Sequence, residues 1–209
     1  MICCFGGTFD PVHIGHLAGA RRVADVLDLP VRMVLSARPS HRDQPGATID
    51  ERLAMLDIAC APWPALTPDA REARRDGPSY TVHTLEALRM QHPREAIGWV
   101  IGRDTLLTLD TWFEWQRVFE LAHLIVLDRV GFEGALPAAV AAEIREQTEA
   151  RMPVAPSGAV IHLPGALPAV SATEVRRRLA TGEPVAHWLP TGVFQFLRRR
   201  KIYGGMCDA

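Results

Sequence analysis

The sequence predicts an α/β fold in which a twisted, mostly parallel sheet carries helices on both faces. Short apolar runs of strand length alternate along the chain with longer segments whose apolar residues recur at helical spacing. The first two runs, residues 1–5 and 31–35, flank such a helical segment, and this order implies a right-handed crossover between parallel strands. The length of 209 residues suits one domain with a sizeable core.

The turn after the first strand, residues 5–16, reads FGGTFDPVHIGH and precedes a helix that we expect to begin near His13. Gly6 and Gly7 lack a Cβ, so the backbone there can adopt unusual dihedral angles and a ligand can approach closely. The free N–H groups and the positive dipole end of the helix would face whatever lies above Gly6, Gly7 and Thr8. The turn therefore predicts an anion site.

His13 and His16 lie three residues apart, a spacing that places both imidazoles on one helix face near its N-terminus. Imidazoles in this position can donate hydrogen bonds to phosphate oxygens and stabilise the charge that develops during phosphoryl chemistry. A glycine pair or a surface histidine taken alone is more often structural. Their combination in one strand-to-helix turn favours a functional site.

The next segments continue the alternation. Residues 36–48 follow the second strand and are rich in proline, glycine and polar residues, so we predict a loop past the carboxyl end of a strand, where α/β sheets bind ligands. Within this loop, His41 and Arg42 could meet a phosphate. Asp50 is a credible N-cap for the helix that follows. Apolar residues up to Cys60 mark the buried face of this helix.

Further strands are expected in five short segments, at residues 65–67, 71–73, 96–101, 121–127 and 159–163. Ser79 or Thr81 is expected to cap a third helix, whose N-terminus is available to a small anion such as a carboxylate. An Ala- and Glu-rich segment, residues 136–150, predicts another helix, and Pro190 suits the first position of the last one.

Two polar positions near strand ends are candidate ligand contacts. Asp104 follows the strand at residues 96–101 and can accept a hydrogen bond from a ribose hydroxyl. Trp112 belongs to an aromatic-rich stretch, and aromatic residues at this density are usually core residues. A tryptophan is nevertheless the best stacking partner for a flat ring.

A second phosphate clamp is predicted near the end of the chain, where residues 171–176 open a helix. Ser171 or Thr173 would cap this helix, and Arg176 lies one turn in. Hydroxyl groups, a helix N-terminus and a guanidinium together suit a phosphate.

The composition excludes several classes of function. The chain has 23 basic and 24 acidic residues and a formal net charge of −1, which disfavours extended nucleic-acid binding. Its one lysine, Lys201, excludes a Walker A loop. The four cysteines show neither zinc-site nor disulfide spacing, and no apolar run is long enough to span a bilayer. We therefore expect a cytoplasmic protein without a membrane partner.

The two clamps carry a resemblance to a known superfamily. Residues 5–16 look like the (H/T)xGH motif of the nucleotidyltransferases, and residues 171–176, SATEVR, look like their ISSTxIR motif, with Ala172 replacing the more usual second serine. Between them lie four segments whose order and spacing are similar to those of the bacterial nicotinate-nucleotide adenylyltransferases, at residues 38–42, 78–81, 101–104 and 111–112. Ser40 stands where the PPHR element of that family has a proline.

The resemblance covers nearly the whole chain and implies a Rossmann-like nucleotidyltransferase fold. It implies one domain at residues 1–209, in which residues 171–209 form a helical part that completes the ATP site. The implied reaction joins ATP and nicotinate mononucleotide to give deamido-NAD and pyrophosphate, a step of NAD synthesis. No general base is needed, because the 5′-phosphate of the mononucleotide already carries the attacking oxygen.

The resemblance also implies roles for individual residues. The catalytic contacts to the ATP phosphates and the leaving pyrophosphate are assigned to His13, His16 and Arg176. Further ATP-binding residues are Gly6, Gly7, Thr8, Phe9, Asp104, Ser171 and Thr173. The mononucleotide is expected to contact His41, Arg42, Tyr80, Thr81 and Trp112. Magnesium is expected to be carried by the ATP phosphates and not by protein ligands, because no carboxylate cluster lies near the motifs. Asp10 is expected to be a structural residue of the turn.

Several alternatives remain open at the level of the sequence. Phosphopantetheine adenylyltransferases share both phosphate motifs, and a nicotinamide-preferring adenylyltransferase is a closer rival. Class I aminoacyl-tRNA synthetases carry the same HIGH tetrapeptide but need a lysine-rich loop and a tRNA-binding body, and one lysine and 209 residues argue against them. A sensor that binds ATP without turnover is the non-enzymatic alternative. The sequence does not decide whether the chain forms a homo-oligomer.

Overall fold

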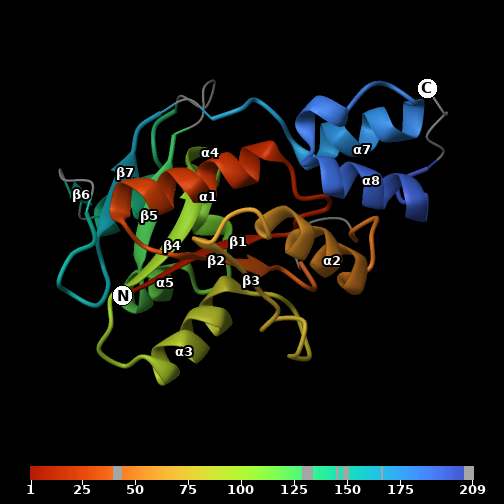
Figure 1. The fold of residues 1–209 in the computed structure, drawn as a ribbon. Coiled ribbons are helices and arrows are strands. Elements are labelled where there is room, and N and C mark those ends of the chain that lie inside the picture. Colours follow the sequence, from red (N-terminus) through yellow and green to blue (C-terminus); the bar gives the residue numbers. More distant parts are fainter. Residues whose placement is uncertain (40–43, 129–133, 145, 148–150, 166, 205–209) are drawn as a thin grey trace.

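The computed structural model describes residues 1–39, 44–128, 134–144, 146–147, 151–165 and 167–204 (Figure 1). Its centre is a seven-stranded sheet in the order β3-β2-β1-β4-β5-β7-β6, in which every neighbouring pair is parallel. The strands are β1 (Ile2–Gly7), β2 (Val31–Leu35), β3 (Leu66–Asp69), β4 (Ile97–Gly102), β5 (His123–Leu127), β6 (Glu146–Gln147) and β7 (Val160–Leu163). The predicted fold class is confirmed.

Helices cover both faces of this sheet (Figure 1). One apolar core joins the sheet to α1 (Ile14–Leu27), α2 (Ile49–Cys60), α7 (Ala172–Thr181) and α8 (Thr191–Arg200). A second core on the opposite face includes residues of α3 (Thr81–Gln91), α4 (Arg103–Leu106), α5 (Trp115–Leu121) and α6 (Ala138–Glu143). Two short 3₁₀ turns are η1 (Leu109–Thr111) and η2 (Ala186–Trp188). Because successive side chains of a strand point to opposite faces, Cys3 and Cys4 of β1 belong to different cores.

The sheet reverses its direction of growth between β1 and β4. From β1 the chain adds β2 and then β3 on one side, and it returns to place β4 and β5 on the other. The loops that leave β1 and β4 therefore diverge, which opens a crevice at the carboxyl ends of these two strands.

The second helix begins earlier than the sequence predicts. Thr48, and not Asp50, is the N-cap of α2, because the Thr48 hydroxyl accepts a hydrogen bond from Glu51 N at 3.2 Å. The Glu51 carboxylate in turn accepts from Thr48 N at 2.9 Å. This reciprocal capping box outcompetes an aspartate that lies two positions later.

Two other predicted elements differ in the structure. Residues 71–73 form turns and not a strand, because the Asp69 carboxylate binds both the backbone N–H and the Nε of Arg71. The helix predicted at 136–150 ends at Glu143, and residues 146–147 instead pair with β7. Residues 145 and 148–150 lie outside the described part of the chain.

The described cysteines are buried free thiols, Cys3, Cys4 and Cys60. Burial raises the pKa of Cys4 and that of Cys60 to about 12, so both thiols keep their protons. Cys207 lies outside the described residues. None of the described helices combines the length and the apolar character that a membrane crossing requires.

Candidate active site

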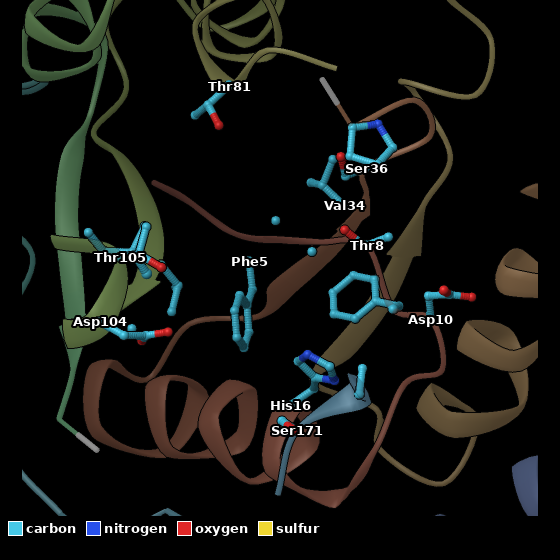
Figure 2. Close-up of a pocket in the computed structure, with 18 of the residues that line it drawn as sticks. Phe5, Thr8, Asp10, His16, Val34, Ser36, Thr81, Asp104, Thr105 and Ser171 are labelled. Carbon is cyan, nitrogen blue, oxygen red and sulfur yellow. The ribbon is translucent and has the colours of Figure 1, made fainter. Parts of the chain in front are cut away.

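A cavity of about 760 Å³ lies at the carboxyl ends of β1 and β4. Its lining combines the turn after β1 with the start of α7, so residues from both ends of the chain share it, among them His13, His16, Ser171, Thr173 and Arg176. In Figure 2, His16 and Ser171 lie at one end and Thr81 at the other, with Asp104 and Thr105 along one side. The two clamps predicted from the sequence therefore meet in one site.

The two glycines of the turn do not adopt the unusual dihedral angles that the sequence suggested, and packing gives a separate reason for their size. Gly6 and Gly7 are the last residues of β1, and neither has a positive φ. A Cβ on Gly6 would overlap the ring of Trp99, and a Cβ on Gly7 would lie 2.7 Å from the ring of Phe9. The left-handed residue of the turn is Phe9 itself, with φ 48°. Packing against two aromatic rings therefore excludes larger residues at both glycine positions.

His13 and His16 cap the first helix reciprocally. His16 N donates to His13 Nδ1 at 3.4 Å, and His13 N donates to His16 Nδ1 at 3.3 Å. The two rings are stacked, with centroids 3.7 Å apart. Because each Nδ1 accepts a backbone hydrogen bond, the ring proton of each neutral imidazole is on Nε2. Both residues line the cavity, at the N-terminus of α1.

A buried arginine of α2 holds the turns around the cavity. Arg52 is only 1% exposed, and it donates to three backbone carbonyls, those of Thr8 at 3.0 Å, Ser36 at 2.7 Å and Ala37 at 2.7 Å. The first carbonyl follows β1 and the other two follow β2, so one guanidinium fixes both turns to each other. Burial lowers the pKa of Arg52, an effect that the nearby Asp10 carboxylate opposes.

The second clamp is formed at the start of α7. Ser171 is the N-cap, and its hydroxyl accepts from Glu174 N at 3.2 Å. Arg176 Nη1 donates to the carbonyl oxygen of Asp10 at 2.7 Å, which ties the helix to the first turn. Arg176 Nη2 lies 3.5 Å from the hydroxyl of Thr173.

The opposite end of the cavity contains the start of α3. Its N-cap is Tyr80, and no side chain caps it, which corrects the expectation that Ser79 or Thr81 would do so. The Ser79 hydroxyl instead accepts from Arg38 N at 3.0 Å and secures the loop after β2. Thr81, the first residue of α3, and Trp112 both line the cavity.

The remaining sequence predictions differ in outcome. Asp104 lines the cavity, as do Gly6, Gly7, Thr8 and Phe9. Tyr80 is not among the lining residues, because its ring stacks on Phe113 with centroids 4.5 Å apart. His41 and Arg42 lie outside the described residues.

The cavity also has lining residues that were not predicted from the sequence, among them Ser36, Glu72 and Trp99. Ser36 directly follows β2, so its position past a strand end was a usable signal. Glu72 is 5% exposed and accepts a hydrogen bond from the Thr84 hydroxyl of α3. Nothing in the local sequence distinguishes this glutamate from a surface residue.

Comparison with known proteins agrees with the geometry. Residues 4–178 match the family model described as cytidylyltransferase-like. The chain is 40% identical to a probable nicotinate-nucleotide adenylyltransferase of Stenotrophomonas maltophilia, covering 95% of both chains. It is also 40% identical to a protein of the same description from Aeromonas hydrophila, covering 95% of this chain and 94% of the relative.

Solved structures show the same fold. The structure is similar to the nicotinic acid mononucleotide adenylyltransferase of Plasmodium falciparum in complex with NaAD, with a TM-score of 0.75, 16% identity and coverage of 97% and 96% of the two chains. A putative nicotinate-nucleotide adenylyltransferase of Vibrio parahaemolyticus gives a TM-score of 0.63 at 18% identity, covering 97% of this chain and 94% of the other.

Proposed function

We infer that this chain is a nucleotidyltransferase that transfers the AMP moiety of ATP to nicotinate mononucleotide. The chain belongs to the cytidylyltransferase-like family and is similar to nicotinate-nucleotide adenylyltransferases. The products are deamido-NAD and pyrophosphate, and the reaction belongs to NAD biosynthesis.

The observation that carries this function is the single cavity shared by both phosphate motifs. His13 and His16 from the first turn and Arg176 from α7 line one space of about 760 Å³. Nucleotidyl transfer needs in-line positioning and stabilisation of charge on the phosphates more than it needs a protein nucleophile. A polyphosphate held from two sides meets both requirements.

Each of these residues has a proposed role in the transfer. A phosphate oxygen of the mononucleotide attacks the α-phosphorus of ATP, and the bond to the bridging oxygen of the leaving pyrophosphate breaks. The Nε2–H groups of His13 and His16 donate to the phosphate oxygens that gain charge. Arg176, together with the hydroxyls of Ser171 and Thr173, holds the pyrophosphate. Gly6, Gly7, Thr8 and Phe9 shape the cradle, and Asp104 accepts from a sugar hydroxyl.

Magnesium fits this site as an ion brought in by ATP. The described residues contain no group of three or more His, Cys, Asp or Glu side chains that could hold a metal ion by themselves. When bound to the phosphates, Mg²⁺ would neutralise part of their charge. Protein residues then have only to accommodate the complex of metal and phosphate.

The start of α3 supports the acid as the acceptor. Because the Tyr80 side chain makes no capping hydrogen bond in the described part of the chain, we propose that the first N–H groups of this helix bind a carboxylate near Thr81. Trp112 would stack on the pyridine ring. A carboxamide offers less charge to the helix dipole, so we expect the acid to be preferred over the amide by about tenfold or more in kcat/KM.

The function is tested by measuring pyrophosphate release from ATP and Mg²⁺ with each of three acceptors. Nicotinate mononucleotide should be the best substrate, followed by nicotinamide mononucleotide, with no reaction of 4′-phosphopantetheine. A preference for either of the other acceptors would contradict the proposal. ATP binding without release for any acceptor would identify a sensor.

A further inference from the structure

The structure links the C-terminal end of the chain to the first motif through a side chain with no predicted role. The hydroxyl of Tyr203 donates to Asp10 Oδ1 at 2.6 Å, across 193 positions of sequence. We propose that Tyr203 is a positioning residue, which holds Asp10 so that this carboxylate leaves Arg176 available to the ATP polyphosphate. The inference rests on the proposed function, because it assigns Arg176 to the phosphates.

Asp10 is a buried junction between three segments of the chain. It is 3% exposed, and its carboxylate accepts from Gly46 N at 2.9 Å and from Ala47 N at 3.1 Å, in the loop before α2. In Figure 2 its carboxylate points away from the centre of the cavity. Arg176 Nη1 binds the Asp10 carbonyl at 2.7 Å and lies 3.6 Å from Oδ2. Asp10 therefore holds Arg176 mainly through its backbone, and its carboxylate forms only a long ion pair.

The environment of Tyr203 suits a permanent hydrogen-bond donor. Burial and then the adjacent Asp10 carboxylate raise its pKa well above the usual range, so the hydroxyl keeps its proton. Its ring also packs against Gly46 in the loop before α2. The contact is so close that a Cβ on Gly46 would lie 3.1 Å from ring atoms Cδ1 and Cε1. The ring and the hydroxyl thus have separable functions, packing and donation.

Removing the hydroxyl would change the balance of charge around Asp10. A buried carboxylate that loses one donor is stabilised by another, and a cation within reach among the described residues is the Arg176 guanidinium, 3.6 Å away. A shorter ion pair between them would draw the guanidinium toward the protein and away from the ligand. ATP would then have to break this ion pair before it could bind Arg176.

The test is Tyr203→Phe, which keeps the ring and removes only the donor. The KM for ATP should rise by about tenfold, the loss expected for one hydrogen bond to a charged group, while the KM for the mononucleotide changes less than about twofold. Gln195→Ala, on the exposed side of α8, is the matched control and should behave as the unmodified chain. Equal changes in both KM values, or none, would overturn the proposal.

A double-mutant cycle shows whether Tyr203 acts through Arg176. In the background of Arg176→Lys, which lacks the fork-shaped guanidinium, Tyr203→Phe should have little further effect on ATP. Additive effects would contradict a positioning role. Calorimetric binding of a non-hydrolysable α,β-methylene analogue of ATP gives the same comparison without turnover. The binding assay therefore tests the role of Tyr203 independently of whether the chain catalyses the proposed reaction.

Discussion

Each imidazole of the His13–His16 pair has two tasks. Nδ1 of each ring accepts a hydrogen bond from the partner's backbone and so begins α1, and Nε2 is the atom to which we assign the contact with the phosphates. The same two side chains therefore begin the helix and carry the proposed catalytic role. A substitution at either position changes both, and a useful variant must preserve the cap.

His16→Asn should separate these two tasks, because the asparagine oxygen can still accept from the His13 backbone. Turnover should fall by about 10²–10³-fold, since a donor that acts mainly on the transition state is lost. The dissociation constant of ATP should change by much less. Steady-state kinetics and calorimetry measure the two quantities. His187→Asn, at an exposed position, serves as the control, and matching losses in turnover and ATP affinity would contradict the assignment.

Trp112 gives a prediction about the acceptor. Trp112→Phe keeps an aromatic ring of smaller area against the second core and should raise the apparent KM of the mononucleotide several-fold, while the KM for ATP stays within about twofold. Initial rates at varied concentrations of each substrate provide the test. A rise in the KM for ATP alone would show that the Trp112 ring contacts ATP and not the mononucleotide.

At the scale of elements, β5 is connected to the loop before β7 by a buried histidine. His123 is fully buried, its Nδ1 accepts from Ala159 N at 3.0 Å, and its Nε2 is 2.7 Å from the carbonyl oxygen of Ala155. The neutral ring satisfies both partners, whereas a protonated Nδ1 could no longer accept. Burial lowers the pKa of His123; the hydrogen bond to Ala155 opposes this effect, and the charge of Arg89 adds to it.

This arrangement predicts a loss of stability in mild acid. The unfolded chain takes up a proton on His123 near its ordinary pKa of 6.5, whereas the folded chain takes it up only at lower pH. The unfolded state thus binds more protons, and the free energy of unfolding falls as the pH drops below about 6.5. Urea titrations at pH 7 and pH 5 should show a smaller loss of stability in His123→Gln than in the unmodified chain. An unchanged difference between the two pH values would contradict the prediction, and His187→Gln is the control.

The helix ends show how far sequence reasoning reaches at this scale. Strands and helices with clear apolar periodicity were predicted, and Ser171 caps α7 as one of the two alternatives proposed. The caps of α2 and α3 were wrong, because several polar residues compete at each end and tertiary contacts choose between them. Ser79, for example, binds the backbone of Arg38 across the loop and is therefore not a cap. The residues around Ser79 do not predict its contact with Arg38.

At the scale of the whole molecule, the C-terminal helices belong to the main core. Val175 and Leu179 of α7 and Val193 and Leu197 of α8 are buried in the same cluster as Met55 of α2. The shared cavity and the two matched motifs were accessible from sequence, whereas the link from Tyr203 to Asp10 was not. Its two ends are 193 residues apart, and neither lies in a pattern that predicts the other.

We predict that residues 1–209 form a single domain and therefore unfold in one step. Urea midpoints from tryptophan fluorescence and from far-UV circular dichroism should coincide. A chain truncated after residue 170 should lose the cooperative transition, because removing α7 and α8 exposes the apolar surface of α2. Two separate transitions in the full chain would instead reveal an independent C-terminal unit.

Trp99 forms part of the cavity wall beside Gly6, and Trp112 also lines the cavity. Two of the five tryptophans of the chain therefore line the cavity that we propose binds the nucleotides. Replacing the other three, Trp63, Trp115 and Trp188, with phenylalanine would leave an emission spectrum that originates only from the cavity. In such a chain, the binding of each substrate would change the intrinsic tryptophan fluorescence, so no attached dye would be needed.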